Sequence, residues 1–502
     1  MRTLPQLALV LLSAALHAAA FPPWDLPLLA WVALAPLLVA LDGQGPRRAW
    51  WLGALWGTAA HWCEAAWVLP AMRDYYQQPG WFAGLFGCVS SLLFRGLPYG
   101  LFAAAASWLT RSQRAPRRAA TLAALWVAVE FLRARGPTED PWLLMGYALS
   151  GSPLLLQGAD LGGIPLLSFV IVFVNAALAA CLRATPGRVA AAAIAVALLV
   201  GSGAYGLARM ATPLPDAPAV PISIVQGNND LGAQWRQEHY GAGLQTYLDL
   251  SRAAAARAHP RVLIWPESAV TFFLAREPRF LAPIQALLAE TGAELITGAP
   301  HVEDPDPARP AFFNSAFTVT ADGIAARYDK VRLLPFAEFF PLRFSDFLRR
   351  RFDHVRAFTP GRDDLLLDTR MGRVAVVICF EAVFAELVRA RMNQGAEVLV
   401  NLSNDAWLGA GSGPAQHLAM VVPRAVENRT WVVRATTSGI SAVIDPYGVV
   451  HDATPTFVTA VIDARIAPLR IETLYERCGD WFAWACVGWC GVAAMRRRRR
   501  VG

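Results

Sequence analysis

Long apolar segments fill most of the first 210 residues, and this feature restricts the possible folds more than any other. Apolar runs lie near 4–20, 26–42, 50–70, 81–109, 119–134, 161–182 and 187–208, and one more lies near 480–495. Runs of about 20 apolar residues are long enough to cross the hydrocarbon core of a bilayer. Backbone groups in lipid must pair within their own segment, so these runs are predicted to be helices of a membrane α-helical bundle.

Composition agrees with a membrane protein. The chain is 55% hydrophobic and 17% charged, and its mean hydropathy is +0.36. Its 18 tryptophans fit membrane interfaces, where this residue is enriched. The net charge of +7 comes without a basic face interleaved with aromatics, which argues against nucleic-acid binding. Seven cysteines without a CxxC pair indicate neither a disulfide framework nor a zinc site, and we expect no metal and no cofactor.

Loop charges predict the topology. Arginines gather in alternate loops, at 47–48, 111–118 and 183–188, and the positive-inside rule places these loops in the cytoplasm. If 81–109 crosses once, the count is eight transmembrane helices with both ends inside, and the arginine run 496–500 anchors the last one. Two alternatives remain. Residues 4–20 could be a signal peptide, and 81–109, broken by Gly96 and Pro98, could be two helices that violate the charge pattern.

A different pattern begins at about residue 213, where four closely spaced prolines mark a linker. Strands are predicted at 221–226, 261–266, 294–298, 314–320, 324–329, 373–379, 396–402, 431–436 and 440–445, and helices at 235–257, 280–291, 384–394 and 415–429. This α/β alternation predicts one domain with its own core. The expected organisation is therefore 1–210 with transmembrane helices 1–7, an extracytoplasmic domain at 213–470, and 478–502 with helix 8.

The segment 373–381 contains the strongest candidate for a nucleophile. A continuous apolar run, typical of a strand buried on both faces, leads directly into Cys379. The thiol would then lie at the carboxyl end of the strand, where α/β folds place their ligands. A catalytic thiol needs this combination of rigid support and access to a cleft. The alternative is that Cys379 is a small buried hydrophobe, as most free cysteines are.

Two further strand ends carry suitable groups. The strand at 261–266 leads into Glu267, which could accept a proton from a thiol if burial raises its pKa; alternatively it is an ordinary turn acid. Lys330, the only lysine among 45 basic residues, follows another strand, and Glu338 comes eight residues later. A fixed ammonium can stabilise the oxyanion of a tetrahedral intermediate, whereas the alternative is an exposed lysine.

Glu, Lys and Cys in this chain order are the pattern of the carbon–nitrogen hydrolase (nitrilase) superfamily. The resemblance becomes closer in the segments 21–25, 226–228 with Trp235, 265–267, 335–338, 379–381, 401–407 and 473–481. Together these motifs resemble the bacterial apolipoprotein N-acyltransferase family over nearly the whole chain. The resemblance implies a nitrilase-like αββα sandwich beside the membrane bundle. It further implies a multi-pass protein of the bacterial inner membrane whose catalytic domain is periplasmic, and we expect a monomer.

The resemblance also implies a two-step acyl transfer, the last step of lipoprotein maturation. Cys379 would take a fatty acyl chain from a phospholipid, typically phosphatidylethanolamine, as a thioester. The acceptor would be the amino-terminal amine of a diacylglyceryl-cysteine apolipoprotein. In family terms Glu267 is the general base, Lys330 stabilises the oxyanion and Glu338 is a second essential acid. Supporting roles are implied for Trp235 on a loop over the site, for Glu381 lining the pocket, and for Phe380, where the family often has tyrosine.

Two other functions use the same sequence features. A membrane-tethered amidase or nitrilase would use the same three residues with water as acceptor. A transporter would need internally repeated spans and paired ionisable residues at mid-membrane, and the sequence has neither in clear form. Among the remaining polar residues, His417 is interpreted as structural, and Arg95 is expected to face the bundle interior or to snorkel towards lipid headgroups. The 140–142 loop is expected near the site.

Overall fold

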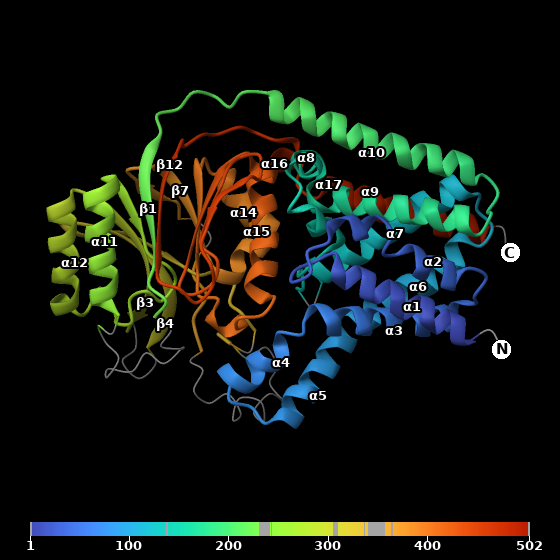
Figure 1. The fold of residues 1–502 in the computed structure, drawn as a ribbon, viewed down its shortest axis with the longest axis horizontal. Coiled ribbons are helices and arrows are strands. Elements are labelled where there is room, and N and C mark those ends of the chain that lie inside the picture. The colour runs from blue at the N-terminus through green and yellow to red at the C-terminus, as the bar shows by residue number, and fades with distance from the viewer. Residues whose placement is uncertain are drawn as a thin grey trace.

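A helical bundle and an α/β sandwich lie end to end along the long axis of the molecule (Figure 1). This computed structural model describes residues 3–136, 139–229, 241, 243–304, 310–335, 337–339, 357–362 and 365–499. Both chain ends lie at the end of the bundle that is far from the sandwich, and an extended linker joins the two parts (Figure 1).

A helix lies at each of the apolar segments. These are α1 (Thr3–Ala19), η1 (Pro27–Trp31) with α2 (Ala35–Leu41), α3 (Pro46–Glu64), α5 (Gly80–Ser91) with η3 (Leu92–Gly96) and α6 (Leu97–Thr110), α7 (Ala115–Arg135), α9 (Ala159–Leu182), α10 (Arg188–Ala211) and α17 (Trp481–Arg498). Three helical runs of the described residues are long and apolar enough to span a bilayer: Gly80–Thr110, Ala159–Leu182 and Arg188–Ala211. The count of eight crossings therefore stays a prediction.

One open alternative is decided by these helices. The run Gly80–Thr110 is continuous through a π-helical turn, which confirms the single-segment interpretation of 81–109. The first helix, α1, is a packed member of the bundle, because the Ser13 hydroxyl donates to the carbonyl oxygen of Ala33 at 2.6 Å and accepts from Trp56 Nε1 at 3.0 Å. The interpretation of 4–20 as a first membrane helix stays a prediction.

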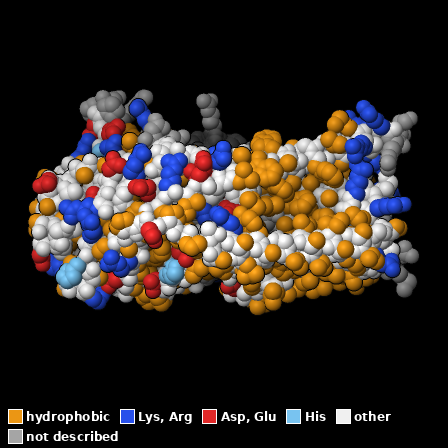
Figure 2. Space-filling view, turned by 90° about the horizontal axis from the view of Figure 1, so that it is seen from above, with side chains coloured by type: hydrophobic (Ala, Val, Ile, Leu, Met, Phe, Trp, Pro, Cys, Tyr) orange, Lys and Arg blue, Asp and Glu red, His pale blue; other side chains and the backbone are white. Residues whose placement is uncertain are grey.

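The outer surface of the bundle is apolar. Figure 2 shows hydrophobic side chains covering the bundle half of the molecule, with basic side chains, all of them arginine, gathered at the end far from the sandwich. Large apolar side chains are exposed there, including Leu182 at 65% and Val200 at 65%. Contiguous apolar surface of this extent on a folded protein indicates contact with a membrane.

Two six-stranded sheets form the middle of the sandwich. The first has the order β12-β1-β2-β3-β4-β5 and the second β11-β10-β9-β8-β7-β6. The first contains β1 (Val220–Gln226), β2 (Val262–Ile264), β3 (Glu294–Glu303), β4 (Ala311–Thr320), β5 (Gly323–Asp329) and β12 (Ala460–Ile466). The second contains β6 (Leu367–Thr369), β7 (Gly372–Ile378), β8 (Val398–Ser403), β9 (Trp431–Thr436), β10 (Ala442–Ile444) and β11 (Val450–Ala453). Every predicted strand is present, and β6, β11 and β12 are additional.

Helices cover both outer faces, which gives the expected αββα layering. The helices α11 (Leu244–Ala258) and α12 (Pro278–Thr291) cover the first sheet, and α14 (Ala385–Met392) and α15 (Gly413–Asn428) lie between the second sheet and the bundle (Figure 1). The predicted helix 235–257 is observed from Leu244; its residues 235–240 and 242 lie outside the described part of the chain. Along β7, Val374 and Val376 pack between the sheets, whereas Ala375 and Val377 pack towards α14 and α15.

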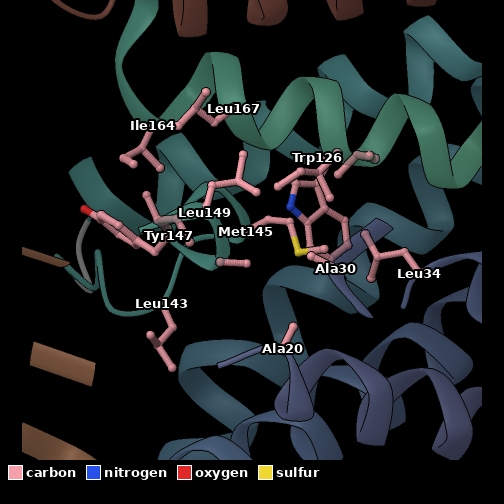
Figure 3. Close-up of a cluster of buried hydrophobic side chains, with 14 of the residues drawn as sticks. Ala20, Ala30, Leu34, Trp126, Leu143, Met145, Tyr147, Leu149, Ile164 and Leu167 are labelled. Carbon is pink, nitrogen blue, oxygen red and sulfur yellow. The ribbon is translucent and has the colours of Figure 1, made fainter. Parts of the chain in front are cut away.

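The core of the bundle continues into the sandwich. One buried apolar cluster contains Trp126 of α7, Tyr147 of η4 (Met145–Leu149), Val421 of α15 and Val377 of β7. Figure 3 shows the bundle side of this cluster, in which Trp126, Met145 and Leu149 lie between the helices. A shared core means that the second sheet is mounted on the bundle and is not tethered to it by the linkers alone.

The Gln416 amide is one of several contacts that tie the two parts together. Gln416 of α15 is fully buried. Its Oε1 accepts hydrogen bonds from Trp67 Nε1 at 3.1 Å and Trp142 Nε1 at 3.0 Å, and its Nε2 donates to the carbonyl oxygens of Pro22 at 2.9 Å and Glu64 at 2.8 Å. Segments on both sides of α3 are thereby joined to the sandwich, which gives the 21–25 motif a structural role.

We expect Gln416→Leu to lower the free energy of unfolding by about 3 kcal/mol, because buried donors and acceptors of the bundle would lose their partners. Thermal unfolding in detergent would measure the loss. The control is Gln245→Leu, an exposed glutamine of α11 that bonds Asp249 at 2.7 Å. Equal melting temperatures of the two variants would contradict a joining role for Gln416.

Arg95 faces the bundle interior, which was one of the two predictions for this residue; the other was that it snorkels towards lipid headgroups. Its side chain is 3% exposed and forms ion pairs with Asp140 and, at 3.9 Å, with Glu64. Its Nη2 also donates to the carbonyl oxygen of Trp142 at 2.5 Å. A guanidinium among apolar helices requires such partners. Arg95 thus holds the loop that carries Trp142.

Candidate active site

Cys379 lies at the point where β7 ends. It is the first residue of the 3₁₀ turn η7 (Cys379–Val383), and its φ of +54° is in the left-handed region that residues other than glycine rarely adopt. Strained backbone of this kind is found at functional sites, where the surrounding structure must hold it. Here the hold is visible: Asn401 Nδ2 donates to the carbonyl oxygens of Val377 at 3.1 Å and Cys379 at 3.4 Å.

Glu267 lies on the turn after β2. Its Oε1 accepts from Asn314 Nδ2 at 2.7 Å, and its Oε2 accepts from the backbone N–H of Asn404 at 2.6 Å. Thr437 Oγ1 donates to the carbonyl oxygen of Glu267 at 2.8 Å. Contacts from β4 and from the loop after β8 therefore fix the carboxylate, and the contact from the loop after β9 fixes the backbone that carries it.

Lys330 follows β5 directly and points at two carboxylates. Its Nζ lies 2.9 Å from the Glu338 carboxylate and 3.7 Å from Glu267 Oε1. Lys330, Glu267 and Cys379 are 2%, 6% and 4% exposed, respectively. The structure thus brings Glu338, Glu267 and Lys330 together. Lys330 is buried and is not the exposed surface lysine of the alternative interpretation.

Burial and the neighbouring charges set the protonation behaviour of the site. Burial raises the pKa of the Cys379 thiol well above its usual value; the charge of Glu267 adds to the rise, and Lys330 opposes it. Burial also raises the pKa of Glu267, and the charge of Lys330 opposes this rise. For Lys330, burial lowers the pKa, but Glu338 and Glu267 raise it more, so the net pKa is above its usual value. The resting site is a neutral thiol beside a carboxyl group and a permanent ammonium, so thiol attack requires transfer of its proton to a base.

Asn314 of β4 is a site residue that sequence reasoning missed. Its Nδ2 donates to Oε1 of Glu267 at 2.7 Å and to Oε1 of Glu338 at 2.9 Å. One amide therefore holds the two carboxylates on either side of Lys330. The signal in the sequence was a lone amide within an apolar strand, but its partners lie 47 and 24 residues away along the chain.

Glu381 lies on the turn that begins at Cys379, and its place in the pocket lining stays a prediction. The side chain is fully buried. Its carboxylate accepts from the Tyr328 hydroxyl at 2.8 Å and from the backbone N–H groups of Val331 at 2.7 Å, Arg332 at 2.9 Å and Ile378 at 2.7 Å. It thereby ties the loop after Lys330 to the end of β7, next to Cys379.

Phe380 connects the site to the bundle. Its half-buried ring stacks on Trp142 with a centroid distance of 6.4 Å and contacts Phe384 edge-on at 5.0 Å. The 140–142 loop therefore lies near the site, as predicted. Trp235 lies outside the described residues.

His417 belongs to a buried network behind the strand ends. Its Nδ1 lies 3.0 Å from Asp405 Oδ1, and Asp405 also accepts from Arg434 Nη2 at 2.6 Å and Ser403 Oγ at 2.7 Å. Burial lowers the pKa of His417, which favours the neutral ring. This network orders the turn that presents the Asn404 N–H to Glu267, in keeping with a structural role. Among the described residues, no group of three or more His, Cys, Asp and Glu side chains forms a metal site.

Comparisons with known proteins place both parts of the chain. An amidase of the nitrilase superfamily from Nesterenkonia is 18% identical with a TM-score of 0.39, covering 55% of this chain and 99% of that one. Residues 13–177 match the family model described as apolipoprotein N-acyltransferase N-terminal domain, and residues 222–475 match the carbon–nitrogen hydrolase model.

Full-length relatives extend this likeness. An apolipoprotein N-acyltransferase from Geobacter metallireducens is 36% identical over 98% of this chain and 95% of its own length. One from Azotobacter vinelandii is 34% identical over the same shares. The chain belongs to the apolipoprotein N-acyltransferase family.

Proposed function

We propose that this acyltransferase moves a fatty acyl chain from a membrane phospholipid, typically phosphatidylethanolamine, through a Cys379 thioester to the amino-terminal amine of a diacylglyceryl-cysteine apolipoprotein. The observation that carries the proposal is the buried set of Glu267, Lys330 and Cys379 at neighbouring strand ends, next to a bundle with an apolar surface. Membership of the family supports a lipid donor and a lipoprotein acceptor.

In the first step, the Glu267 carboxylate takes the proton of the Cys379 thiol as sulfur attacks the ester carbonyl of the phospholipid. The resulting oxyanion is stabilised by the Lys330 ammonium. The carbon–oxygen bond of the ester then breaks, and the leaving alcohol takes the proton from Glu267. The products are a lysophospholipid and an acyl thioester on Cys379.

In the second step, the acceptor amine attacks the thioester carbonyl. Glu267 takes a proton from the nitrogen, the carbon–sulfur bond breaks, and the sulfur leaves and recovers a proton from Glu267. The products are an amide and the free Cys379 thiol. The burial of the three groups supports transfer to an amine over hydrolysis, because a dry site protects the thioester from water.

The remaining predicted site residues support this set. Glu338 keeps Lys330 charged and in place through its 2.9 Å contact. Glu381 holds the loop after Lys330 against the Cys379 turn, and Phe380 packs the turn on the bundle. Trp235 is proposed to cover the site from its loop.

The proposed seating has eight membrane crossings, with 1–210 carrying seven and 478–502 the eighth, and the catalytic domain 213–470 on the periplasmic side of the bacterial inner membrane. Helices at all eight apolar segments and the basic side chains at the far end of the bundle support it. Reporter fusions would test it: periplasm-dependent activity is expected for a fusion after residue 212 and not for one within 111–118. The reverse pattern would contradict this orientation.

Acyl-enzyme trapping tests the function. Purified enzyme incubated with phosphatidylethanolamine is expected to gain the mass of one acyl chain on the peptide containing Cys379, and a diacylated lipopeptide should then discharge it as a triacylated product. Failure to trap acylated Cys379 would refute the mechanism. Discharge of the thioester to free fatty acid by water, with no lipopeptide product, would indicate the hydrolase instead.

We expect Asn314→Ala to shift the acidic limb of the pH–rate profile to higher pH by about one unit. The Asn314 amide favours ionised Glu267 and lowers the pKa of that carboxyl, so its loss raises the pKa and the base form appears only at higher pH. Thioester formation measured across pH in single turnovers would show the shift. The control is Asn393→Ala, an exposed asparagine whose loss should leave the profile unchanged. If Asn314→Ala instead lowers the rate equally at every pH, Asn314 has a structural role only.

A further inference from the structure

A groove runs between α7 and α17 on the outer surface of the bundle, away from the residues of the catalytic set. Its volume is about 720 Å³, within the range of about 300–1,000 Å³ that small-molecule sites occupy. Its walls are apolar and include Phe131, Leu132, Trp484 and Val487. Leu132 and Trp484 are 60% and 62% exposed, so the groove is open to whatever surrounds the bundle.

Charged groups of both signs close one end of the groove. Arg135 and Asp480 line it and form an ion pair with each other. Arg135 Nη1 also lies 2.9 Å from Glu386 Oε1 of α14. Arg135 and Asp480 are 30% and 15% exposed, so a ligand in the groove can reach them, and Glu386, which lines the adjoining cavity, is 22% exposed.

A small cavity with both polar and apolar walls adjoins this charged end. It has a volume of about 40 Å³ and shares Phe131, Arg135 and Asp480 with the groove. Arg424 lines the cavity and is fully buried, yet its Nε and Nη1 find no acceptor among the described residues. Buried donors of this kind require a partner, and 40 Å³ holds about one water molecule or one small polar group.

We propose that this groove binds one resident phospholipid with a zwitterionic headgroup, its acyl chain along the apolar walls and its phosphate and ammonium on the array of Arg135, Asp480 and Glu386. Arginine forms paired hydrogen bonds with phosphate, and carboxylates complement an ammonium. Trp481 and Trp484, at the start of α17, place this end of the groove at the level where aromatic side chains meet lipid headgroups. The proposal rests on the proposed membrane seating.

The bound lipid is not the acyl donor. The cavity between the groove and η7 is too small to admit an acyl chain, and Ala382 and Val383 of η7 are buried. The site nevertheless adjoins the catalytic loop. Glu386 lies 3.1 Å from Nη2 of Arg332, which is two residues after Lys330. The backbone N–H of Arg332 in turn donates to the carboxylate of Glu381. Occupancy of the groove thus supports the loop from its outer side.

Native mass spectrometry of the full-length enzyme with added phosphatidylethanolamine tests the site. One retained lipid is expected in the unmodified enzyme and in Cys379→Ala, with retention weakened about tenfold or more in Leu132→Trp, which fills the groove, and in Arg135→Gln, which removes the phosphate contact. The matched controls are Val200→Trp on α10 and Arg252→Gln on α11, both outside the groove. Melting temperatures would establish that the variants are folded.

Equal retention in groove and control variants would overturn the proposal. Lipid held by Cys379→Ala but converted to lysophospholipid in the active enzyme would show that the groove holds the donor, and would overturn the resident role. Acylation of Cys379 is scored in the same samples. If Cys379 is not acylated, the proposed function is contradicted. If the groove variants retain as much lipid as the controls, only the groove proposal is contradicted.

Discussion

Replacement of Cys379 by alanine is expected to abolish thioester formation and to lower acyl transfer by on the order of 10⁴-fold or more, as removal of an enzyme's nucleophile does. Alanine removes the sulfur that would carry the acyl chain and makes no other change to the turn, in which residue 379 has a φ of +54°. The measurement is the yield of triacylated lipopeptide together with the mass of the Cys379 peptide. Cys379→Ser should fold equally well and remain nearly inactive, because a hydroxyl is harder to deprotonate than a thiol.

Cys486→Ala is the matched control. Cys486 is a free cysteine of α17 that is as buried as Cys379, with 4% exposure for each. Its loss is expected to leave transfer unchanged. Activity retained by Cys379→Ala would refute nucleophilic catalysis at this thiol, and a loss in both variants would point to a general effect of removing a buried sulfur.

Replacement of Lys330 by methionine is expected to lower the rate by about 10²–10³-fold, because the oxyanion loses its cation. It should also destabilise the fold by about 3–5 kcal/mol, because Glu267 and Glu338 would remain buried without their countercharge. Since Lys330 lowers the pKa of Glu267, its removal raises that pKa further, and the residual activity should require higher pH. Single-turnover rates across pH and thermal unfolding would measure these effects.

Lys330→Arg separates charge from shape. The ammonium lies 2.9 Å from Glu338 in a site with 2% exposure, so a planar guanidinium is expected to displace its neighbours and to lose most of the activity. Retained activity would mean that charge alone suffices. Arg327→Met, on β5 and partly exposed in a pair with Glu303, is the control for removing a cation from this strand.

Much of the sandwich could be predicted because its inner strands are continuous apolar runs. The strands β7, β8 and β9 are buried on both faces, so their hydrophobic pattern is strong. The strands β6, β11 and β12 were missed. All three lie at sheet edges: every residue of β11 is exposed, β6 has three residues, and only Ile462 and Ile466 of β12 are buried. An edge strand buries little apolar surface, so local sequence carries little of its signal.

The catalytic candidates were readable for a related reason. Glu267, Lys330 and Cys379 each follow an apolar strand, and strands of a sandwich end near one another, so their sequence positions already indicated a shared site. The membrane character of the first 210 residues was equally readable, because a bilayer demands long apolar helices whatever their tertiary partners.

Contacts between distant parts of the chain decided the rest. Asn314 bridges two carboxylates, Glu381 holds a loop that begins about 50 residues earlier, and Gln416 joins α15 to segments some 350–390 residues away. A polar side chain in an apolar run shows that it needs a partner when buried, but the partner is chosen by packing of the whole fold. Chain order therefore revealed which groups carry the chemistry, and tertiary packing determined which amides and carboxylates hold them in place.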